Sequence, residues 1–174
     1  MTRYLVGFTA GLVVFCAAQA QAQTAVVNDK EISAIVITGN QGEIEAGKLA
    51  KSNAGSQEVK AFAQRMVTDH TSMNQSATTL TQKLQIEPEE NDTSREMKET
   101  NEKSLKALQE LKGSSFDKAY IADQITMHKQ VLTSIDKTLL PNAKNPELKA
   151  MLTKARGSVA LHLQHAEQLQ KKLQ

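Results

Sequence analysis

Four side chains that could bind a metal ion each fall on the apolar face of a different expected helix: Glu43, His70, His128 and His162. The chain has only four histidines, so composition alone does not explain three of them in one interior. Imidazole nitrogens and carboxylate oxygens that converge inside a helix bundle are the usual donors to a metal ion. Three nitrogens and one oxygen suit a single divalent ion such as Zn, Cu(II), Ni or Fe. We therefore expect one mononuclear metal site built from these four residues.

The spacing of apolar residues indicates the helices that would position these side chains. Along residues 57–85 and 146–173, apolar residues recur at intervals of three or four positions, and His70 and His162 fall in these series. Similar faces along 114–140 and 29–53 include His128 and Glu43. Each of the four residues lies near the middle of its helix. In a bundle, the midpoints of the helices lie at the same height along the bundle axis, whether the helices run parallel or antiparallel. The four side chains should therefore meet in one layer.

Capping patterns give the expected ends of these helices. Asn28 and Glu31 have the spacing of a capping box at the start of the first helix. Thr93 and Glu96 are expected to cap a shorter, highly charged helix that crosses back along the bundle. Pro146 is expected at the first position of the last helix, where proline is favoured. The sequence therefore predicts an all-α protein, a four-helix bundle with an additional shorter crossover helix.

The first 22 residues have the pattern of an export signal. Arg3 precedes a short apolar run over 5–18, and residues 18–20 and 20–22 are both small-x-small cleavage patterns. The apolar run is shorter than the ~20 residues that a membrane span needs. We expect a signal peptide over 1–22 and a helical domain over 28–173, without a transmembrane segment after cleavage. The expected location is the periplasm, with outer-membrane association as a variant.

The mature chain would have a restricted chemistry. Cys16 is the only cysteine and would leave with the signal, so nitrogen and oxygen atoms must hold any metal. Without Arg3 the 21 basic residues become 20 against 19 acidic ones, and no basic cluster suggests nucleic acid as a partner. We find no nucleophile–base pair, carboxylate dyad or organic-cofactor motif. These features favour binding of a metal ion over enzymatic turnover.

Several stretches resemble a family of small secreted bacterial proteins. They are residues 41–44, 60–70, 116–121 with His128, and 162–163. That family carries a domain of unknown function and is often labelled as outer-membrane or secreted protein. The resemblance covers about residues 30–173 and implies a ferritin-like fold and export, but no established activity.

The resemblance does not extend to a di-iron centre. Ferritin-like di-iron proteins place Glu-x-x-His on two helices and further glutamates on the other two. Here Val67, Ile125 and Val159 stand three residues before the three candidate histidines. One inward carboxylate instead of four argues against a bridged pair of iron ions.

Further polar residues share the inner faces. Gln124 and Asp117 lie on the face of His128 and are predicted to support the metal ligands from behind. His165, at the edge of its helix face, is a further possible ligand, and Asp69 is expected at a similar edge. The methionines at positions 66, 73, 127 and 151 are expected to fill the core.

Two other functions remain open from the sequence. The histidines and Glu43 could form a buried hydrogen-bonded network that fixes helix register in a structural or envelope-stress protein. A small metal-dependent oxidase or peroxidase built on the same residues is a weaker alternative. Metal content would separate the first alternative from a metal-binding protein.

Overall fold

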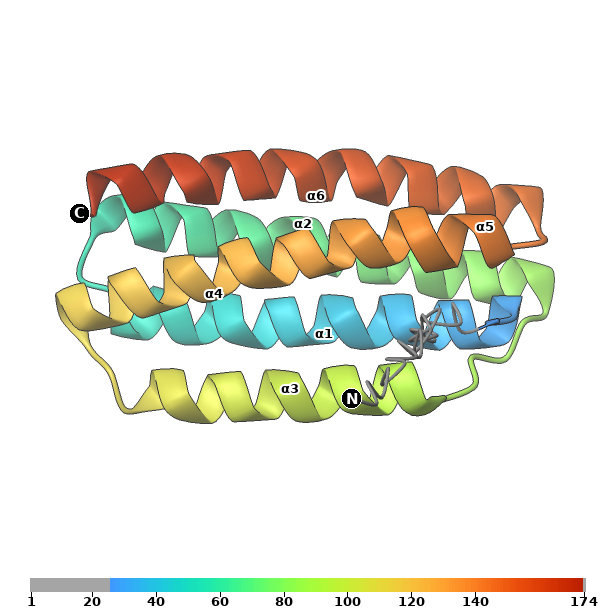
Figure 1. Cartoon of the computed structure of the whole chain (residues 1–174), viewed down its shortest axis with the longest axis horizontal. Helices are drawn as coiled ribbons and strands as arrows, with labels where there is room; N and C mark the ends of the chain where they lie inside the picture. Colours follow the sequence, from blue (N-terminus) through green and yellow to red (C-terminus); the bar gives the residue numbers. More distant parts are fainter. Residues whose placement is uncertain (1–25, 174) are drawn as a thin grey trace, which may run out of the picture.

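The structure is a computed structural model, which describes residues 26–173 (Figure 1). The elements within this range are α1 (Asp29–Asn53), α2 (Gln57–Leu84), α3 (Asp92–Gln109), α4 (Gly113–Ser134), the π-helical turn η1 (Ile135–Leu139), α5 (Leu140–Asn142) and α6 (Pro146–Lys172). The described residues contain no β-strand, and the prediction of an all-α protein is confirmed. The predicted signal peptide lies outside this range. Within residues 26–173, no helix has both the length and the apolarity needed to cross a membrane.

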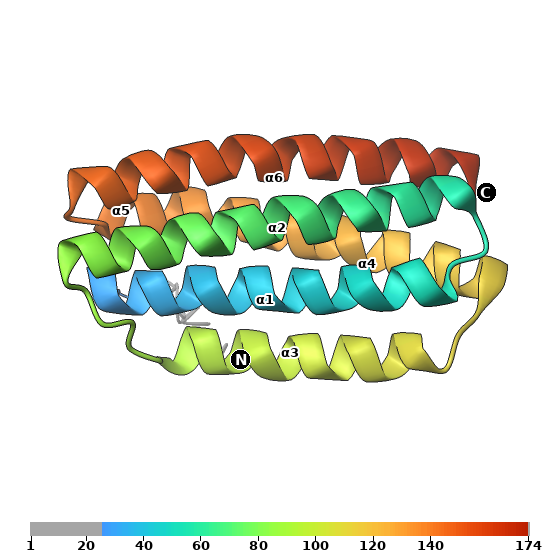
Figure 2. The same cartoon turned by 180° about the vertical axis from the view of Figure 1, so that it is seen from behind.

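Four long helices enclose a common interior. α1 packs on α2 and on α4, and α6 packs on the same two helices. The shorter, charged α3 lies along α1, away from α6, as Figures 1 and 2 show from opposite sides. Most side chains that point into the interior therefore come from α1, α2, α4 or α6, and α3 closes one side.

The start of α1 matches the predicted capping box. The Asn28 Oδ1 accepts from the backbone N–H of Lys30 at 2.9 Å and of Glu31 at 3.1 Å. In return, the Glu31 carboxylate accepts from the backbone N–H of Asn28 at 2.8 Å. These bonds satisfy donors that a helix N-terminus leaves without intrahelical partners.

The predicted cap of the charged helix is wrong by two residues. α3 begins at Asp92, and Asn91 is its N-cap, with the Asn91 Oδ1 accepting from the Ser94 backbone N–H at 2.9 Å. The Ser94 hydroxyl oxygen accepts in return from the Asn91 N–H at 3.0 Å. Asparagine is as good a cap as threonine or better, so Thr93 lies inside the first turn.

The end of α4 contains a widened turn that the sequence does not predict. In η1 the backbone N–H of Leu140 donates to the carbonyl of Ile135, five residues earlier. α5 follows without a break and includes Pro141 in its first turn. Single π turns of this kind are rare and often occur at functional sites. This one lines the internal cavity described below.

The apolar interior consists of two separate clusters. One lies at the α1–α2 turn and comprises Ala46, Ala50, Ala54, Val59, Phe62, Ala63, Met66, Leu108, Phe116, Tyr120, Ile121, Ile125, Ala166 and Leu169. The other lies at the opposite end and comprises Val27, Ile32, Ile35, Ile135, Leu139, Ala143, Leu148 and Leu152. Between the two clusters each long helix carries a buried polar side chain, Glu43, His70, His128 or His162, and these form a polar layer between the two cores.

Candidate metal centre

Three histidines meet in this polar layer, one each from α2, α4 and α6. His70, His128 and His162 are all buried, with 4%, 2% and 1% of their surface exposed. One ring nitrogen from each lies within 4.8 Å of the other two. The ring centroids are 5.9 Å apart for His70 and His128, 5.3 Å for His70 and His162, and 5.6 Å for His128 and His162. The expectation that these residues share one level is confirmed.

An oxygen acceptor fixes the orientation of two of the rings. The Nδ1 of His70 lies 2.9 Å from the Asn40 Oδ1, and the Nδ1 of His128 lies 2.9 Å from the Gln124 carbonyl oxygen. Both oxygens can only accept a hydrogen bond, so each Nδ1 carries the proton. In the neutral ring the Nε2 then has a free lone pair.

His162 is held the opposite way round. Its Nε2 lies 2.8 Å from the Asp69 Oδ2, which also accepts from the Arg65 Nε at 3.3 Å. The Asp69 side chain is 35% exposed, so the pair lies at the border between the interior and the solvent. The carboxylate places the proton of His162 on Nε2 and leaves Nδ1 with the lone pair.

Within residues 26–173, the remaining ring nitrogens have no hydrogen-bond partner. The Nε2 of His70, the Nε2 of His128 and the Nδ1 of His162 are buried and lack a hydrogen bond among the described residues. An isolated buried acceptor costs about 1–3 kcal/mol, so three in one place require an explanation. A histidine that binds a metal typically donates its other N–H to a carboxylate or a carbonyl. All three histidines show this arrangement.

Burial keeps His70 and His162 in the form that binds metal. Burial and, to a smaller extent, repulsion from His128 and His162 together lower the pKa of His70 to about 3, although Asp69 opposes this. Burial also lowers the pKa of His162, although the hydrogen bond to Asp69 opposes this. Metal coordination needs a neutral imidazole, so neither ring has to lose a proton near neutral pH.

Glu43 lies in the same layer, beside His128, but it does not belong to the group of three histidines. Its Oε2 accepts from the Gln124 Nε2 at 2.8 Å. Its Oε1 is 3.8 Å from the Nδ1 of His128, the nitrogen that already donates to a backbone carbonyl. Burial raises the pKa of this carboxyl, while His128 and Gln124 oppose the rise. The structure therefore brings the predicted fourth ligand beside the three-histidine cluster but not among its free nitrogens.

The structure distributes the other predicted site residues differently. Gln124 contacts both Glu43 and His128, as its place on the inner face of α4 suggests. Asp117 lies elsewhere, because its carboxylate accepts from the backbone N–H groups of Gly55 at 3.0 Å and Ser56 at 2.8 Å. It therefore fixes the α1–α2 turn and does not support a metal ligand.

His165 has a different environment again. It is half-buried, and its ring meets that of Phe62 edge-on, with the centroids 5.2 Å apart. The three-histidine cluster does not include it. An aromatic contact at the edge of the apolar core is a sufficient structural role for this side chain.

Asn40 and Asp69 are the partners that sequence reasoning missed or undervalued. Asn40 lies three residues before Glu43, on the same face of α1, so helical spacing offered a signal for it. Asp69 is next to His70 in sequence but contacts the histidine of another helix. Spacing along one helix carries no information about such a contact.

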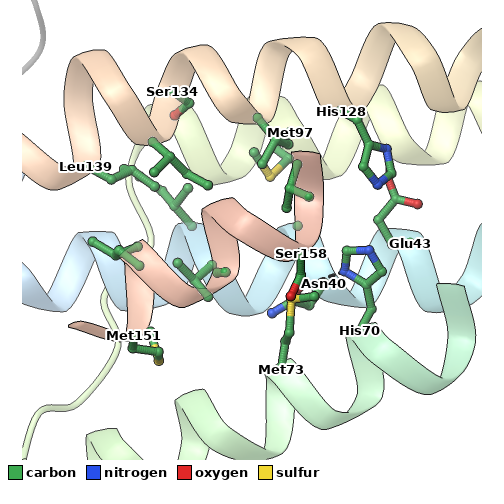
Figure 3. Close-up of a pocket in the computed structure, with 18 of the residues that line it drawn as sticks. Asn40, Glu43, His70, Met73, Met97, His128, Ser134, Leu139, Met151 and Ser158 are labelled. Atoms are coloured by element: carbon green, nitrogen blue, oxygen red, sulfur yellow. Dashed lines mark hydrogen bonds and ion pairs between the residues drawn. The ribbon is translucent and has the colours of Figure 1, made fainter. Parts of the chain in front are cut away.

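A cavity of about 960 Å³ opens beside the cluster. Figure 3 shows Asn40, Glu43, His70 and His128 close together, with Leu139 and Met151 farther along the cavity. Of the methionines expected to fill the core, Met66 is fully buried in it and Met151 packs against the cluster at the other end. Those at positions 73, 127 and 151 are half-buried and line the cavity, together with Met97.

Comparison with known proteins gives a family but no activity. No curated protein and no solved structure matches the chain. Residues 15–169 match the family described as "Domain of unknown function (DUF4142)". This match spans most of the sequence, and we conclude that the chain belongs to the DUF4142 family.

Proposed function

We propose that this protein binds one divalent transition-metal ion through His70, His128 and His162. One observation supports the proposal above the others: each ring is fixed by an oxygen acceptor on one nitrogen and has a free, buried nitrogen on the other. Each of the three histidines has one ring nitrogen that lies within 4.8 Å of a ring nitrogen of the other two. A cation between them would satisfy all three lone pairs at once.

The donor set narrows the choice of metal. Three imidazoles suit Zn, Cu(II), Ni or Fe(II), whereas Mg and Ca prefer oxygen ligands. Glu43 is our candidate for a fourth ligand, because its Oε1 is buried and unpaired beside His128. A three-histidine site without Glu43 would keep one coordination position open for water or another small ligand.

We also propose a fold class and a cellular location that are consistent with metal binding. Four long helices around an internal layer of metal ligands are typical of the ferritin-like bundles, and we assign the domain to that class. The pattern over residues 1–22 supports export to the periplasm. We propose a protein that binds or stores metal there.

Metal binding can be tested on mature protein purified without a histidine tag and stripped with a chelator. Adding zinc should raise the melting temperature, because an ion that binds only the folded state adds about 2.7 kcal/mol at a hundred times its Kd. The effect should weaken as the pH falls towards the lowered pKa values of His70 and His162, where protons compete with the metal for these imidazoles. If no divalent first-row metal changes the melting temperature, the proposal is wrong.

A matched pair of variants locates the site. His128→Gln should lower zinc affinity tenfold or more, about 1.4 kcal/mol, because it removes one ligand. His165→Gln should leave zinc affinity unchanged, because that ring packs on Phe62 outside the cluster. Equal losses in the two variants would contradict this site.

The alternative function is a metal-free structural network. The hydrogen bonds from His70 to Asn40 and from Gln124 to Glu43 favour it, because they form without an ion. Under this alternative His128→Gln would destabilise the chelated protein itself by about 1–3 kcal/mol. Under the metal proposal, most of the loss would occur only when zinc is present.

A further inference from the structure

The cavity beside the histidines has the size and shape of a small-molecule site. Its volume of about 960 Å³ falls within the range of roughly 300–1,000 Å³ that is common for ligand pockets. It runs between α1, α2, α4 and α6, and side chains of α3 close part of it. The metal site proposed above would therefore border a space large enough for an organic molecule.

Most of the cavity wall away from the histidines is apolar. The apolar side chains there come from every long helix and from η1, and they include Val36, Leu80, Met97, Val131, Ile135, Leu139 and Met151. Methionine side chains are flexible and polarisable, so a wall rich in them adapts to aliphatic ligands of varied shape. This part of the cavity suits a hydrocarbon chain.

The other end of the cavity is polar, and its polar groups are incompletely paired. Asn40 is 7% exposed, and its Nδ2 is a buried donor without an acceptor among the described residues. The Nε2 atoms of His70 and His128, our proposed metal ligands, belong to side chains that line the same cavity. A ligand oxygen at this end could bind the metal and accept from Asn40.

The charge at this end favours an anionic head group once a metal is bound. The negative charge of Asp69 is already shared between His162 and Arg65. A divalent ion on the three imidazoles would add positive charge at this end of the cavity, where Glu43 is the nearest buried carboxyl, whereas Glu96, Glu147 and Lys154 line other parts of the wall. A carboxylate can coordinate the ion with one oxygen and accept from an amide with the other.

We propose that the cavity binds a medium-chain aliphatic carboxylic acid. The carboxylate would lie at the metal and the Asn40 amide, and the chain would lie along the methionine-lined wall. This inference rests on the proposed function, because it needs a metal on the three histidines.

The test uses the full mature protein and decanoate as the probe, measured by isothermal titration calorimetry. Zinc binding is measured first, then decanoate binding to the zinc-loaded and the chelated protein. We expect the zinc-loaded protein to bind decanoate roughly tenfold more tightly than the chelated protein, a usual size for coupling between two sites. Butanoate should bind roughly a hundredfold more weakly, because it lacks most of the buried methylene groups. Decanol should also bind more weakly, because it lacks the charge.

Two variants on α6 provide the matched comparison. Ala155 lines the cavity about two helical turns before His162, whereas Thr153 is exposed and does not line it. Ala155→Phe should weaken decanoate binding roughly tenfold by filling the cavity, with zinc binding retained. Thr153→Phe should change neither.

The outcomes separate the two proposals. If zinc binds but decanoate does not, or if decanoate binds the chelated protein equally well, the carboxylate proposal is overturned and the metal site stands. Failure of zinc to bind overturns the metal site, and the carboxylate proposal with it. Unchanged decanoate affinity in folded Ala155→Phe, or equal affinity for butanoate, places the ligand outside this cavity and overturns the proposal. The comparison of decanoate, butanoate and decanol uses the unmodified protein, so the test remains possible if a variant does not fold.

Discussion

The buried histidine layer should make the metal-free protein sensitive to acid, and His70 is the clearest case. Its pKa is about 3 in the folded protein against 6.5 for an ordinary histidine, chiefly because of burial. Below about pH 6.5 the unfolded chain therefore takes up a proton at His70 that the folded protein does not. The contribution of neutral His70 to the free energy of unfolding is therefore fully present above about pH 6.5. It is lost progressively as the pH falls towards the folded-state pKa of about 3.

The size of this effect follows from proton linkage. Each pH unit below the unfolded pKa costs about 1.4 kcal/mol per histidine, so His70 should account for about 2 kcal/mol between about pH 7 and about pH 5. His162 should act in the same direction, because burial lowers its pKa as well. Glu43 acts the opposite way: its raised pKa lets the folded protein bind a proton that the unfolded chain releases.

The assay must therefore separate His70 from Glu43. We would measure urea unfolding in chelator at about pH 5 and about pH 7, comparing Glu43→Gln with the double variant Glu43→Gln/His70→Leu. The single variant should lose about 2 kcal/mol more on acidification than the double variant. Equal losses would mean that His70 titrates normally, and the reasoning from its burial would be refuted.

Four further substitutions test other parts of the structure. Gly47→Ala should lower the free energy of unfolding by about 1–3 kcal/mol, because its new methyl carbon would lie 2.8 Å from a side-chain carbon and 3.0 Å from a backbone oxygen of α2. In Gly157→Ala the new methyl group would have no atom within 4 Å, so this substitution should raise the free energy of unfolding by about 0.5–1 kcal/mol. Thermal unfolding measures the effect of both glycine substitutions. Asp117→Ala should cost about 1–3 kcal/mol by leaving the N–H groups of residues 55 and 56 unpaired, again measured by urea unfolding. Asp69→Asn should weaken zinc binding by roughly 10–100-fold in calorimetry, because the carboxylate orients a ligand histidine, and unchanged affinity would count against that role.

The three-histidine layer could be predicted from the sequence because its cause is geometric. Helical periodicity determines which side of a helix a residue faces, and a position near the midpoint determines its level. His70, His128 and His162 satisfy both conditions in three separate helices, so rough helix boundaries were sufficient. Glu43 satisfies the same conditions and reaches the same layer, but periodicity does not determine which side of His128 it approaches.

Features that depend on contacts between helices could not be predicted. Asp117 faces inward by periodicity, yet it lies near the start of α4 and reaches the α1–α2 turn instead of the histidines. Asp69 lies at the edge of its helix face by periodicity, yet it binds the histidine of another helix. The size of the cavity depends on the distances between helices. Close contacts determine these distances, such as the contact between Gly42 of α1 and Asn101 of α3. A pattern along one helix contains none of these distances.

The division of the interior into two apolar clusters has a consequence for how the molecule opens. The cluster at the α1–α2 turn contains the stacked rings of Phe116 and Tyr120, whereas the opposite cluster borders the cavity. Between them, the polar layer contributes little apolar burial, so cooperativity between the two ends is weak in the metal-free protein. Amide hydrogens at the cavity end should therefore exchange with solvent before those at the aromatic end. An ion held by α2, α4 and α6 would join the two ends, and exchange at both would then follow a single global opening.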